Sequence, residues 1–155
     1  MARHVKFEDL EKFKDKVKES LDSDAVDAFI QSCAKELAAR LLAKVIKRTP
    51  VGQYPKGSGK VGGTLRRGWT GGKTLSATTY AQSLKVNHFA DTYVIEVVNP
   101  VDYASYVEFG HRTRGGNGWV EGRFMLTISE QEIQSGARNI LENKLKKKLG
   151  ECFKW

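Results

Sequence analysis

A long amphipathic helix that ends before Pro50 is the feature that most restricts the fold of this 155-residue chain. Its apolar side chains recur at helical spacing on one face, at Val26, Phe29, Ile30, Cys33, Leu37, Leu41 and Val45. The acidic and hydroxyl side chains of residues 22–24 can cap its start. Pro50 ends it, because proline has no amide hydrogen and disfavours helix in the residue before it. At about 1.5 Å per residue, about 25 residues span about 37 Å, so we expect this helix to lie across a sheet.

Two further amphipathic helices are predicted, one on each side of this region. Near the start of the chain, apolar residues from Phe7 to Leu21 recur at helical spacing among charged residues. Near the end, the terminal helix has an apolar stripe made of Ile133, Ala137, Ile140, Leu141, Leu145 and Leu149. Four lysines within residues 144–148 lie near its C-terminus, where positive charge suits the helix dipole.

Short strands and one short helix are predicted between the long helix and the terminal helix. Residues 92–98 are rich in β-branched side chains, and residues 83–88 alternate apolar and polar side chains. With Asp91 between them, we interpret these two runs as an antiparallel hairpin, preceded by strand-like residues 65–69. Residues 103–109 predict a short helix.

Glycine-rich segments separate these elements. Gly110 closes the short helix, and residues 119–125 either add an edge strand or lead directly into the terminal helix. Residues 50–63 hold five glycines and two prolines, which predicts a long flexible loop that becomes ordered with a partner. A second loop covers residues 111–118. The expected fold is α+β: a long N-terminal helix packed on a small antiparallel sheet, with a C-terminal helix, in one domain over residues 1–155.

The formal net charge of +8 is distributed unevenly. Residues 51–75 carry five basic residues and no acidic one, whereas residues 76–110 carry one basic and four acidic residues. Such asymmetry can attract nucleic acid, or it can let identical subunits meet head to tail. We favour head-to-tail association, because the acidic segment lies within the same small domain.

Cysteine usage and hydropathy point to a cytoplasmic protein without a membrane segment. The two cysteines, Cys33 and Cys152, form no disulfide framework and no paired zinc motif. Cys33 falls on the apolar face of the long helix, where a thiol behaves as a small hydrophobe. The chain begins with charged helix rather than an apolar signal region, and no apolar run approaches the roughly 18 residues of a membrane span.

Two glycine-rich patterns resemble nucleotide-binding motifs but lack the required context. Residues 57–62 fit G-x-G-x-x-G, but that motif needs a strand before it and a helix after it, and here the expected order is reversed. Residues 72–74 resemble the end of a P-loop, but Arg67 stands where that motif requires a glycine. We therefore expect no nucleotide cofactor.

No catalytic or metal-binding set is predicted. The histidines His4, His88 and His111 are widely separated and lack ligand spacing. No serine or cysteine nucleophile can be paired with a base by a local signature. We expect no catalytic residue, no cofactor and no metal.

Arginines interleaved with aromatic residues form the remaining candidate surface: Arg66, Arg67, Trp69, Arg112, Arg114, Trp119 and Arg123. These side chains suit a nucleic-acid groove, because arginine contacts phosphate and aromatic rings stack on bases. Alternatively, the tryptophans are core or interface anchors and the arginines pair with the acidic segment. We favour the second interpretation.

Three stretches, read in order, resemble one protein family over about residues 35–140. The first is R-T-P-V-G at residues 48–52, followed after the loop by G-T-L-R-R-G-W at residues 63–69. The second is Y-A-S-Y-V-E-F-G-H at residues 103–111, and the third is G-W-V-E-G-R-F-M-L at residues 118–126. This order resembles the tail-component family of tailed bacteriophages, variously called minor tail, neck, tail-completion or head–tail joining proteins. Two departures are an expanded loop over residues 53–62 and a glycine at position 68, where a serine is common.

The resemblance implies a non-enzymatic virion protein at the head–tail junction that assembles as a homo-oligomeric ring. It would serve as a neck, tail-completion or terminator protein of a phage, a prophage or a phage-derived contractile particle. The implied partners are further copies of the chain and the neighbouring connector, tail-tube or terminator proteins. DNA is expected only where it passes through the ring lumen, and no membrane is expected. The protein would reside in the virion after assembly in the bacterial host cytoplasm.

The candidate subunit-interface residues combine the aromatic and charged side chains of the three stretches: Arg66, Arg67, Trp69, Tyr106, Glu108, Phe109, Arg112, Arg114, Trp119 and Phe124. A ring needs contacts in which one patch meets a different patch on the neighbouring copy. The basic residues 51–75 and the acidic residues 76–110 offer such a pair. The alternative function that stays open is a basic nucleic-acid-binding module.

Overall fold

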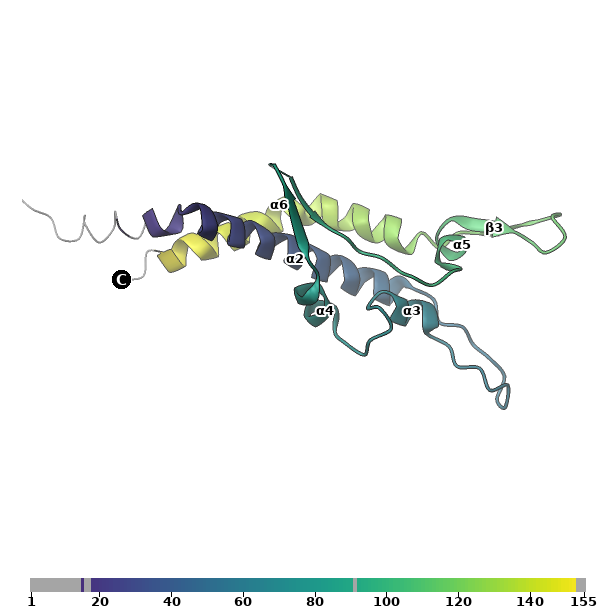
Figure 1. Cartoon of the computed structure of the whole chain (residues 1–155). Coiled ribbons are helices and arrows are strands. Elements are labelled where there is room, and N and C mark those ends of the chain that lie inside the picture. The colour runs from purple at the N-terminus through teal and green to yellow at the C-terminus, as the bar shows by residue number, and fades with distance from the viewer. Residues whose placement is uncertain (1–14, 16–17, 91, 153–155) are drawn as a thin grey trace, which may run out of the picture.

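The computed structural model describes residues 15, 18–90 and 92–152, and its main feature is a pair of long antiparallel helices (Figure 1). Helix α2 spans Ser23–Arg48 and helix α6 spans Met125–Cys152. Both long helices were predicted, and α2 ends as expected just before Thr49 and Pro50. Asp22 occupies the N-cap position of α2, but no side chain there accepts a capping hydrogen bond. The helix predicted over residues 7–21 lies largely outside the described residues.

Two short helices, α3 (Thr64–Gly68) and α4 (Ala77–Ser83), follow the long helix α2. The strand predicted over residues 65–69 is therefore wrong. Leu65 and Trp69 stand four residues apart, which places both on one face of a helix, and both are buried. Helix α4 was not predicted. Its start is capped by Ser76, whose hydroxyl accepts a hydrogen bond from the Thr79 amide at 3.1 Å.

The predicted antiparallel hairpin is confirmed as β1 (Val86–Phe89) and β2 (Thr92–Ile95). Both strands are shorter than expected, and residues 96–98 continue as chain that is neither helix nor strand. The hairpin packs against α2 and is held there by Asp27. The Asp27 carboxylate accepts a hydrogen bond from the Tyr93 hydroxyl at 2.7 Å and pairs with His88 at 3.2 Å.

A short helix and a second small hairpin connect the sheet region to α6. Helix α5 (Ala104–Phe109) is confirmed, and Gly110 closes it with a φ of 87°. Strand β3 (Gly110–Arg112) pairs antiparallel with β4 (Trp119–Glu121). Residues 111 and 112, predicted as loop, thus belong to a strand, and the connecting loop covers residues 113–118. This hairpin projects from the body of the molecule (Figure 1).

The core lies at one end of the helix pair. It consists of residues from α2, α3, α4 and the first turn of α6: Ala38, Ala39, Leu42, Val45, Leu65, Trp69, Ala81 and Met125. We call this end, with α3, α5, β3, β4 and the first turns of α6, the motif end. The distal end comprises residues 23–36 of α2 and residues 139–152 of α6. There the apolar stripe is less buried, and Val26 is 38% exposed.

The fold is α+β as predicted, but the buried core joins helices to one another rather than a helix to a broad sheet. Two separate two-stranded sheets are present among the described residues. None of the described helices is long and apolar enough to cross a membrane.

Candidate subunit interface

Thr49 joins the first two sequence stretches of the motif end. Its hydroxyl is fully buried, donates to the Val45 carbonyl at 2.6 Å and accepts from the Trp69 indole nitrogen at 2.8 Å. The Arg66 guanidinium donates two hydrogen bonds, at 2.7 and 3.2 Å, to the Thr49 carbonyl oxygen. These bonds satisfy polar groups at the C-terminus of α2, which would otherwise be costly to bury.

Two of the predicted interface residues, Arg66 and Trp69, are therefore engaged inside the chain. Trp69 is only 3% exposed, and its indole nitrogen and ring both have partners in the core. These side chains fix α3 against α2. Their contacts with Thr49 explain why Arg66 and Trp69 occur in the first stretch, and no contact with another subunit is needed to explain them.

Contacts with Asn99 and Val101 explain why position 68 is a glycine. A Cβ atom at this position would overlap the side-chain oxygen of Asn99 and crowd Val101. Asn99 is held there because its side-chain nitrogen donates to the Leu65 carbonyl at 2.8 Å, and its oxygen accepts from the Val101 amide at 3.2 Å. A side chain at position 68, such as the serine common in the resembling family, would require Asn99 to move.

Glu108 caps the N-terminus of α6. One carboxylate oxygen accepts from the Leu126 amide at 2.9 Å, and the other accepts from the Thr127 amide at 2.9 Å and the Thr127 hydroxyl at 2.7 Å. Glu108 is 6% exposed. A carboxylate at this place satisfies orphan amides and interacts favourably with the helix dipole. This predicted interface residue is thus also engaged inside the chain.

The second and third stretches also meet through their backbones. The Arg123 amide donates to the Val107 carbonyl at 2.7 Å, and the Phe124 amide donates to the Glu108 carbonyl at 3.0 Å. A Cβ atom at Gly122 would overlap the backbone of residues 108–110, so only glycine allows this approach. The two stretches therefore form one unit that connects α5 to the start of α6.

The other four aromatic residues of the predicted interface are exposed. Tyr106, Phe109 and Trp119 are 59%, 62% and 55% exposed, and Phe124 also belongs to the exposed apolar side chains. We call these four residues the exposed aromatic set. They lie on α5, on β4 and in the turn before α6, on the unit that Glu108 fixes. Arg67, Arg112 and Arg114 are exposed as well.

An apolar groove of about 260 Å³ lies beside this set. Its walls come from the C-cap of α3, the chain after β2, α5 and the start of α6: Trp69, Val97, Val98, Asn99, Ala104, Ser105, Glu108, Phe109, Met125 and Leu126. Its volume is just below the roughly 300–1,000 Å³ of sites for small molecules. An open apolar groove of this size suits side chains of another protein segment.

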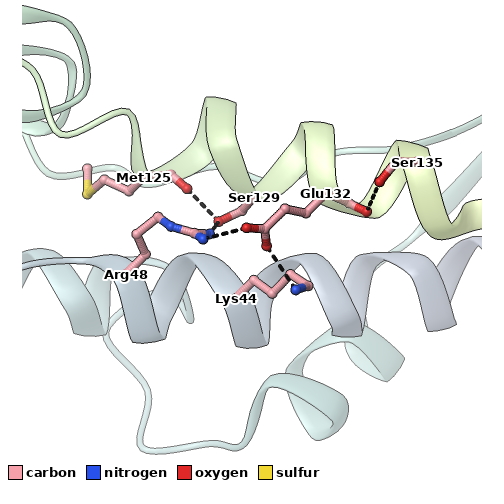
Figure 2. A network of polar contacts seen from close by, with 6 residues as sticks. All are labelled: Lys44, Arg48, Met125, Ser129, Glu132 and Ser135. Carbon is pink, nitrogen blue, oxygen red and sulfur yellow. Dashed lines mark hydrogen bonds and ion pairs between the residues drawn. The ribbon is translucent and has the colours of Figure 1, made fainter.

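An ionic network, which the sequence did not predict, holds the first turns of α6 against α2 (Figure 2). Glu132 accepts from Arg48 at 2.7 Å and from Lys44 at 2.8 Å, and Arg48 also donates to the Ser129 hydroxyl at 2.8 Å. The hydrogen bond from Lys44, followed by that from Arg48, lowers the pKa of Glu132. A second pair at the distal end joins Lys144 to Glu36 at 2.8 Å. Periodicity places such residues on helices, but it does not show which helices face each other.

The described residues contain no group of three or more metal-ligating side chains. A polar cluster outside the motif end consists of Asp27, His88 and Tyr93. The hydrogen bond from Tyr93 is the largest cause of the lowered pKa of Asp27. The His88 and Tyr93 rings stack with centroids 4.0 Å apart. This cluster is explained by its attachment of the β1–β2 hairpin to α2.

One family model matches the chain, over residues 10–110, and is described as "Bacteriophage HK97-gp10, putative tail-component". No curated protein and no solved structure matches. The matched region contains the Thr49 network, Gly68, α5 and Glu108. The third stretch lies beyond it and is linked to it by the hydrogen bonds described above.

Proposed function

Because the chain belongs to the HK97-gp10-like family of bacteriophage tail components, we propose that it acts at the junction between head and tail and assembles as a homo-oligomeric ring. The family is one of structural tail components and not a class of enzymes. Its members are parts of the virion, in agreement with the structural role that the sequence suggested. The position at the junction, as a neck, tail-completion or terminator protein, and the ring are the parts that we propose.

The observation that carries this proposal is the exposed aromatic set. Large aromatic side chains in water are costly, and Tyr and Trp are enriched at the centres of protein interfaces. Here four of them lie on a unit that is fixed from behind by Glu108, Gly122 and the backbone pairs to α5. A rigid support with exposed aromatic side chains suits docking, because little ordering entropy is lost on binding.

The ten predicted interface residues divide into two groups under this proposal. We assign direct contacts to the exposed members: Arg67, Tyr106, Phe109, Arg112, Arg114, Trp119 and Phe124. Arg66, Trp69 and Glu108 act by positioning the others, since their side chains bind within the chain. The partners of this surface are further copies of the chain and the neighbouring connector, tail-tube or terminator proteins.

The β3–β4 hairpin supports one further role in the same particle. Arg112 and Trp119 are paired in its register, both are exposed, and Arg114 lies in its loop. Arginines beside an exposed aromatic ring suit contact with a DNA backbone and its bases. We propose that such contact occurs only where DNA passes through the ring lumen. A separate nucleic-acid-binding module is a weaker candidate because Trp69 and Arg66 are occupied in the chain.

The experiment that tests the proposal removes the gene from the phage or prophage that encodes this chain. We expect filled heads and separate, unattached tails by electron microscopy, with attachment restored when the wild-type protein is supplied. A matched complementation with Leu145→Ser and Leu149→Ser, at the distal end, should restore attachment equally. Normal tails joined to filled heads in the absence of the protein would refute the proposed role.

DNA binding is tested separately with the purified protein. Contacts with phosphates make the logarithm of affinity fall linearly with the logarithm of salt, by about 0.9 for each phosphate contacted in duplex DNA. We expect Arg112→Ala with Arg114→Ala to reduce that slope, and Lys146→Ala with Lys147→Ala to serve as the charge-matched control. A flat salt response of the wild-type protein would remove the DNA contact from the proposal.

A further inference from the structure

Residues 51–62 form a projecting arm with contacts between its two sides. Its two sides approach so closely that a Cβ atom at Gly62 would overlap the carbonyl of Gly52. At the tip, the Ser58 amide donates to the Pro55 carbonyl at 3.2 Å and closes a turn. The arm extends beyond α3, away from α6 (Figure 1). The arm therefore resembles a narrow hairpin that ends in a turn.

The arm carries apolar side chains and positive charge into solvent. Val51, Tyr54 and Val61 are all exposed, with Val61 at 78%. Lys56 and Lys60 accompany them, and the arm contains no acidic residue. Neither lysine has an ion-pair partner within the part of the chain that the structure describes. An exposed Tyr flanked by two valines and two lysines matches an apolar groove with a negative border.

The apolar groove beside α5 has such a border. Residues 97–99 form one wall, and the chain segment over residues 96–102 contains no basic residue. Val98 in this wall is half-exposed, and Phe109 opposite it is mostly exposed. Glu96 and Asp102 flank the wall, are exposed, and have no ion-pair partner among residues 15, 18–90 and 92–152. The charges of the arm and of the groove are thus complementary.

Arm and groove lie on different faces of the same chain. Residues of the arm, Tyr54 and Val61 among them, line a pocket with Tyr103 and Val107. Tyr103 is the N-cap of α5 and stands four residues before Val107, so both side chains lie on one side of the helix. The groove instead uses Ala104, Ser105 and Glu108, on another face. Helix α5 therefore separates the arm from the groove of its own chain. Two different patches on one subunit are what a head-to-tail contact requires.

We propose that the arm of one copy inserts into the apolar groove of a second copy, with Tyr54 and the valines in the groove and Lys56 and Lys60 beside Glu96 and Asp102. This inference rests on the proposed function, because it names the two surfaces through which neighbouring subunits of the proposed ring meet. The expanded loop then lengthens the reach of one subunit over the next. The exposed aromatic set lies at the edge of the same contact.

The test uses a photo-reactive side chain, Tyr54→p-benzoylphenylalanine, in the full chain, both purified and assembled into particles. We expect a covalent dimer after illumination, with the cross-linked peptide falling within residues 96–109 of the second copy. Leu149→p-benzoylphenylalanine, at a similarly exposed position of the distal end, is the matched control and should give no such dimer. Cross-links to other segments of the second copy, cross-links to a different protein, or no cross-link in either preparation would overturn the proposal.

Charge exchange provides an independent readout. Lys56→Glu with Lys60→Glu should reduce the cross-linked dimer several-fold, and adding Glu96→Lys with Asp102→Lys should restore it. Lys146→Glu with Lys147→Glu should have no effect. If Glu96→Lys with Asp102→Lys does not restore the dimer, the proposed pairing of the arm lysines with these two acidic residues is contradicted. A cross-link between purified copies, together with normal tails on filled heads in particles that lack the chain, would refute the head–tail role and leave the arm contact standing.

Discussion

The motif end and the distal end of the helix pair are built from the same two helices but are stabilised in different ways. At the motif end, buried polar side chains such as Thr49, Trp69 and Glu108 bond to backbone groups and fix short elements around a core. At the distal end, the helices are joined by partly exposed pairs such as Lys144–Glu36. The four residues of the exposed aromatic set lie on the fixed motif end, whereas Phe89 of β1 and Tyr54 are exposed aromatic residues elsewhere in the described chain. This difference agrees with the proposal that another subunit docks at the motif end, where the side chains are held in fixed positions.

Trp69→Ala should cause the largest loss of stability at the motif end. Removal of a buried tryptophan typically costs about 3–5 kcal/mol, and here it also leaves the Thr49 hydroxyl without its donor. Urea unfolding followed by circular dichroism measures the loss. Val26→Ala at the distal end, where the side chain is partly exposed, should change stability by about 0.5 kcal/mol or less. Equal losses at both positions would contradict the comparison.

The second variant is Glu108→Gln, which keeps the size of the side chain but removes its charge and one acceptor. Hydrogen bonds to charged groups and the dipole of α6 together predict a loss of about 1–2 kcal/mol. Amide hydrogen exchange of Leu126 and Thr127 should accelerate, which locates the effect. Glu142→Gln, on the exposed face of α6, is the control and should leave both readouts unchanged. Unchanged exchange at residues 126 and 127 would remove Glu108 from its capping role.

The third and smallest effect concerns pH at the distal end. The hydrogen bond from Lys144, with help from Arg40, lowers the pKa of Glu36. A lowered pKa in the folded state gives stability that is fully present above the unfolded value of about 4.3 and is lost as pH falls through the folded value. Glu36→Gln should therefore make the melting temperature less dependent on pH in this acidic range. Partly exposed ion pairs contribute little to stability, so we expect only a small shift in melting temperature and no change in the cooperativity of unfolding. If the melting temperature of Glu36→Gln depends on pH as that of the wild type does, the pairing of Glu36 with Lys144 is contradicted.

The sequence predicted the features that depend on local patterns. The long helix, its end before Pro50, the terminal helix, the 83–98 hairpin and the helix closed by Gly110 all follow from periodicity and from glycine and proline. The segment over residues 65–69 was assigned wrongly, because two apolar residues four apart satisfy both strand alternation and a helical face. Helix α4 was missed because its seven residues present only one buried side chain, Ala81.

The candidate site was predicted by residue type, but its division into two roles was not. Arg66, Trp69 and Glu108 have the same residue types as interface anchors, and only the fold reveals their partners at Thr49, Leu126 and Thr127. Buried polar side chains depend on contacts that are distant in sequence, and spacing does not encode these contacts. One signal was available: the arginine, the tryptophan and the glutamate each occur in a stretch beside a helix end, where backbone groups need partners.

If subunits meet through the motif end, as we propose, sedimentation equilibrium of the purified protein will reveal it. Three proteins are compared at equal concentration: the wild type, Phe109→Ser with Trp119→Ser, and Leu145→Ser with Leu149→Ser at the distal end. All four positions are between 44% and 62% exposed, so each variant should remain folded by circular dichroism. The account predicts oligomers for the wild type and the distal variant, and a folded monomer for the variant at the motif end. Assembly of the motif-end variant like the wild type, or a wild-type protein that is monomeric at every concentration, would contradict it.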